Sequence, residues 1–178
     1  MEQTHDSYKK IAFFISFAVI SFFALQIPVF KLEGAPVAFT LFDFIAPISG
    51  AFVGLIPGVA IVFGAQVINA LLHGGFPHIA SVVRLFPTLF AVAYFALYTK
   101  ESRFKSLILA VPLLAMVAFN LHPIGRTVWY YSLYWLIPVA CFAVKDRFSF
   151  ARSLGATFTA HGVGGAMWIW LFNLPANV

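Results

Sequence analysis

The chain has 178 residues, of which 62% are hydrophobic and 10% are charged, and its mean hydropathy is +0.94. This length accommodates one compact unit, residues 1–178, without a soluble domain beside the apolar segments. The formal net charge is +5. The basic residues nevertheless form no contiguous stripe, so the charge does not indicate a nucleic-acid partner.

Seven long apolar segments make up most of the sequence, and short polar breaks separate them. Each segment is close to the ~17–25 residues that a tilted helix needs to cross a bilayer. The segments are continuously apolar, whereas the strands of a membrane barrel alternate over about ten residues. We therefore predict an all-α fold, a polytopic integral membrane bundle of about seven transmembrane helices. In chain order these are 10–30, 37–55, 58–73, 79–99, 105–121, 127–144 and 153–173.

The breaks between the segments predict the turns. The stretch G-L-I-P-G, Gly54 to Gly58, predicts a tight uncharged turn on the inner side. Short loops rich in His, Gly and Pro are expected on the outer side at 31–36, 73–78 and 122–126. Prolines also lie inside most of the segments, for example at Pro47, Pro87, Pro112 and Pro138. They are either the ordinary prolines of membrane helices or the breaks that frame a transporter site.

Basic residues predict the orientation in a plasma or inner membrane. Eight of them flank the breaks assigned to the inner side, whereas only Lys31 and Arg126 flank the outer loops. Short cytoplasmic loops are enriched in Lys and Arg, so we expect a multi-pass protein with its N-terminus in the cytoplasm.

Two charged residues, Asp43 and Arg84, lie inside apolar segments. A charge at that depth costs on the order of 2.5–3.5 kcal/mol unless it is paired or hydrated. Counted from the outer side at 1.5 Å per residue, Asp43 lies about 9 Å and Arg84 about 7.5 Å into its segment. We predict that they interact. The pair either fixes helix packing or lines a site for a polar ligand that opens outward.

Polar residues on two further segments are site candidates. Asn69 shares one face of the third segment with Gln66 and His73. His161 lies near the middle of the last segment and is either hydrogen-bonded to a neighbouring helix or in contact with a ligand. The nearby residues Ala156, Ala160 and Gly164 form a stripe of small side chains suited to close helix contact.

Aromatic residues crowd the start of the sixth segment, R-T-V-W-Y-Y-S-L-Y-W from Arg126 to Trp135. The stretch is typical of an interfacial aromatic belt. Alternatively, Trp129 and its neighbours beside Arg126 form a platform for a planar ligand, through stacking or cation–π contact.

Several chemical motifs are missing from the sequence. It has no G-x-x-x-x-G-K-[ST] for nucleotide phosphates, and no H-E-x-x-H or Cys/His pair at zinc spacing. Asp43 has no further carboxylates beside it for a proton relay. We therefore expect no catalytic residues, no cofactor and no metal.

The stretch from Phe39 to Gly74 begins F-T-L-F-D and continues into the Gly-rich hairpin around Gly54. It resembles the substrate-binding (S) components of energy-coupling-factor transporters, as does A-T-F-T-A-H-G-V-G-G-A-M-W at 156–168. The resemblance implies a six-helix core, a micronutrient site in the outer half of the bundle, and partners in the form of a transmembrane coupling subunit and ATPases.

Two other classes compete with this interpretation. P-I-S-G at 47–50 and A-H-G-V-G at 160–164 are similar to the serine and histidine motifs of rhomboid intramembrane proteases. Ser49 would then need His161 as its base, but Pro47 replaces the first glycine of that motif. A structural or assembly protein without a ligand is the other alternative.

The sequence as a whole predicts a membrane-embedded substrate-binding subunit of a micronutrient uptake transporter. It would capture a small polar or aromatic nutrient at its outer face and need a separate ATPase module. The expected substrate-binding residues are Asp43, Asn69, Arg84, Arg126, Trp129 and His161.

The orientation can be measured by labelling single cysteines introduced at Ser102, Gly75 and Gly125. With the N-terminus inside, a membrane-impermeant thiol reagent should label positions 75 and 125 in intact cells and leave position 102 protected. The reverse pattern would show that the topology is inverted.

Overall fold

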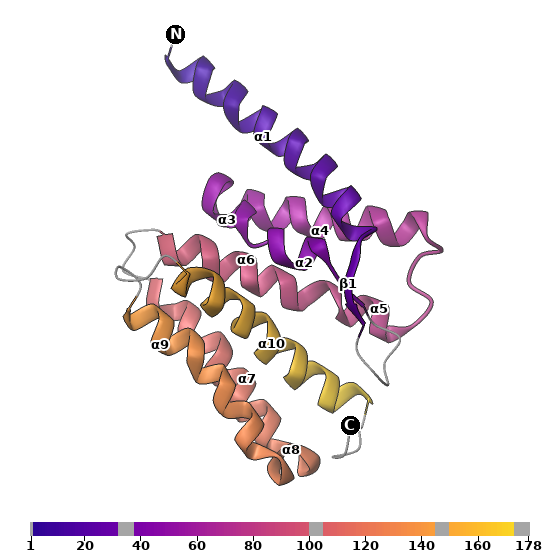
Figure 1. Cartoon of the computed structure of the whole chain (residues 1–178), viewed down its shortest axis with the longest axis vertical. Coiled ribbons are helices and arrows are strands. Elements are labelled where there is room, and N and C mark those ends of the chain that lie inside the picture. Colours follow the sequence, from indigo (N-terminus) through magenta and orange to yellow (C-terminus); the bar gives the residue numbers. More distant parts are fainter. Residues whose placement is uncertain (1, 32–37, 100–104, 145–149, 173–178) are drawn as a thin grey trace.

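The computed structural model describes residues 2–31, 38–99, 105–144 and 150–172. Helices dominate this part of the chain, so the prediction of a mostly helical protein is confirmed (Figure 1). The predicted outer loop 31–36, apart from Lys31, and most of the basic breaks lie outside the described residues. In chain order the elements are α1 (Glu2–Leu25), β1 (Pro28–Lys31), β2 (Ala38–Thr40), α2 (Leu41–Ile45), α3 (Ile48–Val53), α4 (Leu55–Leu72), α5 (Ile79–Val83), α6 (Leu85–Thr99), the 3-10 helix η1 (Lys105–Leu109), α7 (Ala110–Leu121), α8 (Pro123–Thr127), the 3-10 helix η2 (Trp129–Leu136), α9 (Ile137–Ala143) and α10 (Ala151–Phe172).

A two-stranded antiparallel sheet departs from the all-helical prediction. β1 pairs with β2, with an irregular register between Pro28 and Phe30. Pro28 lacks a backbone donor and disfavours helical geometry at the residue before it, which helps to end α1 at Leu25. The helix of the first apolar segment therefore ends before residue 30, and the second segment becomes helical only at Leu41.

The four in-segment prolines lie where one helical piece gives way to the next. Pro47 precedes α3 directly, and Pro87, Pro112 and Pro138 lie in the first turns of α6, α7 and α9. The first N–H groups of a helix have no partner within it, so a proline without a donor is tolerated there. The four segments that contain these prolines are consequently divided into shorter pieces.

Some of the helices are long and apolar enough to be compared with a membrane span. In the described part of the chain, Leu55–Leu72 and Ile79–Tyr98 are long and apolar enough to cross a bilayer by length and composition. Three shorter apolar helices cover Ile11–Leu25, Leu41–Val53 and Ser106–Leu121. The predicted bundle of about seven full-length spans is therefore not confirmed in the described part of the chain.

The predicted inner turn is present but shorter than expected. Gly54 has a φ of 88°, a backbone conformation that favours glycine, and it alone separates α3 from α4. Pro57 lies in the first turn of α4 rather than in the turn itself. The two helices approach closely at Gly58, where a Cβ atom would lie 3.1 Å from the backbone of Gly50.

α10 lies at the centre of the second half of the bundle and packs against α6, α7 and α9 (Figure 1). Its small residues accept large side chains: Gly155 lies against Tyr94, and Gly162 and Gly165 lie against Trp135. Ala156, from the predicted small-residue stripe, is fully buried in the same core. The small residues of α10 therefore allow close helix contact.

Gly50→Ala should destabilise the protein, because the added Cβ would lie 2.4 Å from the Val92 carbonyl oxygen on α6. Overpacking of this kind costs about 1–3 kcal/mol. Gly64→Ala on α4 is the matched control, since a Cβ there meets nothing within 4 Å. Thermal unfolding in detergent measures both, and an equal loss for the two variants would contradict the tight α3–α6 contact.

Candidate functional site

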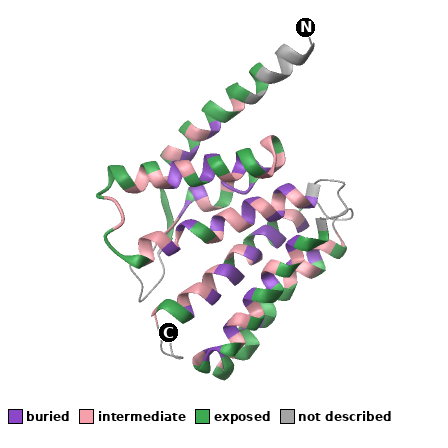
Figure 2. Ribbon diagram, turned by 180° about the vertical axis from the view of Figure 1, so that it is seen from behind, coloured by how far each residue is buried: buried purple, intermediate pink, exposed green. Residues whose placement is uncertain are grey.

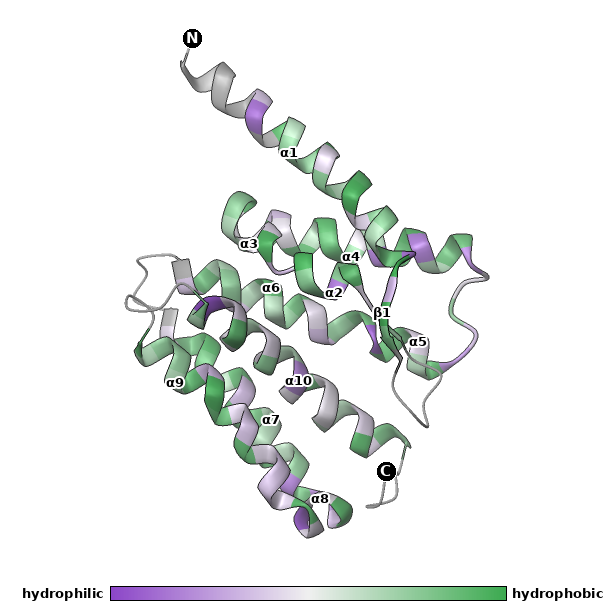
Figure 3. Cartoon of the chain, in the orientation of Figure 1, coloured by the Kyte–Doolittle hydropathy of each residue, from purple (hydrophilic) through white to green (hydrophobic). Residues whose placement is uncertain are grey.

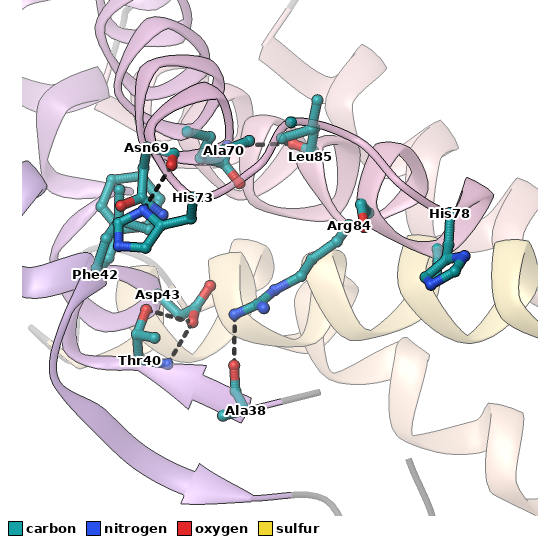
Figure 4. Close-up of a pocket in the computed structure, with 15 residues that line it drawn as sticks. Ala38, Thr40, Phe42, Asp43, Asn69, Ala70, His73, His78, Arg84 and Leu85 are labelled. Atoms are coloured by element: carbon teal, nitrogen blue, oxygen red, sulfur yellow. Dashed lines mark hydrogen bonds between the residues drawn. The ribbon is translucent and has the colours of Figure 1, made fainter. Parts of the chain in front are cut away.

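A cavity of about 340 Å³ opens between the C-terminal end of α4, the α5–α6 junction and the β2–α2 junction (Figure 4). It brings together three of the six predicted site residues, Asp43, Asn69 and Arg84. The residues that line it are Leu25, Ala38, Thr40, Phe42, Asp43, Gln66, Asn69, Ala70, His73, Gly75, His78, Ala80, Ser81, Arg84 and Leu85.

Asp43 is half-buried and belongs to the first turn of α2, where Thr40 is the N-cap residue. Its Oδ2 accepts hydrogen bonds from the Thr40 backbone N–H at 2.8 Å and from the Thr40 hydroxyl at 3.2 Å. This is the return contact of a capping box, and it satisfies a backbone donor at the start of α2. Asp43 therefore has a structural role in addition to its place in the cavity wall.

Arg84 is half-buried at the break between α5 and α6. Its Nη2 donates a hydrogen bond to the backbone carbonyl of Ala38 on β2. Figure 4 shows its side chain extending from the helix toward the strand. The guanidinium thus joins two segments that are far apart in the sequence.

The structure gives no ion pair or hydrogen bond between the described residues Asp43 and Arg84, which were predicted to interact. Among the described residues, their hydrogen bonds run to Thr40 and to Ala38, not to each other. The two side chains nevertheless face each other across one cavity (Figure 4). These hydrogen bonds hold both charged groups in place but use only some of their hydrogen-bonding positions. Both side chains can therefore also bind a ligand.

The α4 wall of the cavity carries the polar face predicted from Gln66, Asn69 and His73. The Gln66 side chain donates to the Leu85 carbonyl at 3.3 Å, next to the α5–α6 break. Asn69 Oδ1 accepts from Gln26 Nε2 at 2.6 Å, which ties α4 to the end of α1. The His73 ring is 2.8 Å from the Asn69 backbone oxygen.

The other three predicted site residues lie outside this cavity wall. His161 is exposed on α10 and touches the rings of Phe39 and Phe158, with centroids 6.0 and 5.9 Å away. Arg126 is exposed in α8 and donates to the Leu121 carbonyl. Position along an apolar segment predicts depth but not which way a side chain points, and so it could not separate these residues from the first three.

Trp129 is 56% exposed and stacks edge-on against Tyr130. Tyr131 and Tyr134 beside it are also exposed on η2. The structure places these rings on the outside of the bundle rather than around the cavity of Asp43 and Arg84. The arrangement matches the aromatic-belt interpretation more closely than a platform in that cavity.

Sequence reasoning did not select several residues of the site. His78, Ser81 and Thr40 line the cavity, and Gln26 orients Asn69. Thr40 could have been found, because Thr three residues before Asp is a capping-box spacing. His78 and Ser81 lie in and after a turn, where polar residues carry no special signal.

Ser49 is fully buried between α3 and α4. Its hydroxyl donates to the Ala46 carbonyl at 2.7 Å and lies 3.4 Å from the Gly58 carbonyl. The described ring contacts of His161 are with Phe39 and Phe158. Both arrangements are those of structural side chains, and the expectation that the two residues form no catalytic pair stays a prediction.

Comparison with known proteins adds no assignment: no family model, curated protein or solved structure matches this chain.

A double-mutant cycle tests whether the two cavity charges are coupled. Asp43→Asn and Arg84→Gln should each destabilise the protein, because each leaves the opposite charge without its neighbour in a half-buried setting. The double variant should cost less than the sum by about 0.5–3 kcal/mol. Asp43→Asn with Arg126→Gln is the control and should be additive, since Arg126 lies outside the cavity wall. Additivity in both cycles would show that Asp43 and Arg84 are independent.

Proposed function

We propose that this protein is a membrane-embedded substrate-binding subunit that captures a small polar or aromatic nutrient in the cavity between α4, α5 and β2. The observation that carries the proposal is the convergence of Asp43 and Arg84 on one opening, with Asn69 in the same wall. A volume of about 340 Å³ suits a small molecule. Both charged residues of the apolar segments would then bind one ligand. This role would explain why the chain keeps them despite the free-energy cost of placing a charge in an apolar segment.

The surface of the bundle supports a membrane setting. Large apolar side chains are exposed on α1, α4, α7 and η2, whereas Ser21, Ser49 and Thr159 are fully buried (Figure 2). Figure 3 shows that hydrophobic residues run along the outer helices over most of their length. Soluble monomers rarely expose contiguous apolar surface of this extent. Examples are Phe14, Ile15, Val19, Ile20 and Phe23 on α1, Ile56, Phe63, Ile68 and Leu71 on α4, and Leu113, Leu114, Val117 and Leu121 on α7.

The position of the cavity supports capture from the outer side. It lies at the end of the bundle where α4 gives way to α5, and α8 also lies toward that end (Figure 1). The α3–α4 turn and the ends of α6 and α9 lie toward the opposite end. With the N-terminus inside, the cavity would open to the exterior.

A separate energising partner is part of the proposal. The sequence contains no phosphate-binding loop, so uptake would require a transmembrane coupling subunit and ATPases, as the resemblance to energy-coupling-factor S components implies. The stretch that carries this resemblance, Phe39–Gly74, contains β2, α2, α3 and α4 and so supplies two walls of the cavity.

Ligand-induced stabilisation tests the function. The purified protein should be screened in detergent with vitamins, nucleobases and amino acids. A ligand at 100 times its dissociation constant adds about 2.7 kcal/mol to the free energy of unfolding, which is visible as a raised melting temperature.

Two matched variants give this screen its control. Ala70 lines the cavity, so Ala70→Phe should abolish the shift. Ala60 is exposed on the same helix, and Ala60→Phe should keep it. If no compound shifts the melting temperature and native purification recovers no ATPase partner, an assembly role without a ligand becomes the better explanation.

A further inference from the structure

We infer that the ligand of this cavity is amphoteric. Arg84 would bind its acidic group, and Asp43 would bind a group that donates a hydrogen bond, such as a cationic group or another N–H-bearing group. The inference rests on the proposed function. Some hydrogen-bonding groups in the cavity wall already have partners within the protein, and the inference follows from those that do not.

Arg84 supplies the anion-binding half. A guanidinium carries five N–H donors, and the bond to the Ala38 carbonyl uses one of its two Nη groups. The remaining edge faces the cavity (Figure 4). Planar paired donors match the geometry of a carboxylate or phosphate. Because Arg84 is anchored to β2, the side chain is already ordered before a ligand arrives.

Asp43 supplies the cation-binding half. Both bonds from Thr40 end on Oδ2, which leaves the Oδ1 oxygen of the carboxylate without a partner among the described residues. An ionised carboxylate can only accept hydrogen bonds. The partner of Oδ1 must therefore bring a proton, as an ammonium, amidine or ring N–H does.

The α4 wall adds one hydrogen-bond donor, and the orientation of its amide group can be deduced. Gln26 Nε2 also donates to the Phe22 carbonyl, so this atom is the amide nitrogen, and Asn69 must present its oxygen to it. The amide N–H donors of Asn69 then remain for the cavity. His73 faces a carbonyl through Nδ1, so Nδ1 carries a proton.

The unused positions thus divide into donors on Arg84 and Asn69 and an acceptor on Asp43. A purely anionic ligand would leave Asp43 unpaired and repelled, and a purely cationic ligand would do the same to Arg84. A half-buried polar group left without a partner costs binding free energy. A ligand with both groups satisfies the two sides at once.

Free amphoteric solutes and the headgroups of zwitterionic phospholipids share this chemistry. The test uses matched trios of probes: phenylalanine, 3-phenylpropionate and phenethylamine, and leucine, 4-methylpentanoate and 3-methylbutylamine. The lipid arm uses short-chain phosphatidylethanolamine beside the corresponding phosphatidic acid. Melting temperatures and binding isotherms of the full-length protein in detergent are the readouts.

We expect the amphoteric member of at least one set to bind about 10- to 100-fold more tightly than either singly charged analogue. Arg84→Gln should abolish the preference over the amine, and Asp43→Asn should abolish the preference over the acid. Arg126→Gln is the control and should change neither preference. Binding in an amino-acid trio identifies a solute as the source, and binding only in the lipid set identifies a headgroup.

Comparison of probes on the unmodified protein keeps the inference testable even if the variants unfold. Equal or tighter binding of a singly charged probe would overturn it while leaving the proposed binding function intact. A protein that binds no probe of these sets, nor any vitamin or nucleobase of the wider screen, would contradict the proposed function itself.

Discussion

Buried backbone carbonyls and amides must be hydrogen-bonded, and the rest of this structure depends on how the chain meets that requirement. Helices meet it locally within each apolar segment, but prolines interrupt the helices. Side chains then donate to carbonyls near the interruptions: Tyr94 to Pro138 at 2.7 Å, Ser49 to Ala46 at 2.7 Å and Gln66 to Leu85 at 3.3 Å. Two of these bonds link different helices, so backbone satisfaction also fixes how the helices are arranged.

The cavity lies where two interruptions of the regular helical structure meet. One is the β2–α2 junction, where Asp43 caps the short helix that follows Thr40. The other is the α5–α6 break, where Arg84 reaches across to Ala38. Each junction brings a charged side chain for a structural purpose, and their meeting leaves the unused edges of both charges facing one space. In this protein the residues that hold the backbone together also form the site that we propose.

Close packing also brings α10 against α6, α7 and α9. An added Cβ would lie 2.3 Å from the Tyr94 hydroxyl oxygen at Gly155 and 2.6 Å from the Trp135 ring at Gly165, and it would be tight, at 3.3 Å from Trp135, at Gly162. Trp135 is 1% exposed, whereas Trp129 at the start of the same 3-10 helix is 56% exposed. Trp135 therefore turns inward where α10 offers glycine, whereas Trp129 faces outward with the apolar exterior of the bundle.

The sequence by itself determined the features that are local in the chain. Continuous hydrophobicity predicted helices, Gly54 predicted the turn between α3 and α4, and Asp43, Asn69 and Arg84 were recognisable as polar residues in apolar surroundings. Only the tertiary structure decided the β1–β2 pairing, the anchoring of Arg84 on Ala38, and the separation of Arg126, Trp129 and His161 from the cavity wall. The reason is physical. Spacing along a segment determines how deep a residue lies, whereas its partners depend on how the helices are rotated and which of them are neighbours. Contacts between residues distant in the sequence determine both the rotation of the helices and their neighbours. The hydrogen bond between Gln26 and Asn69, 43 positions apart, is one example.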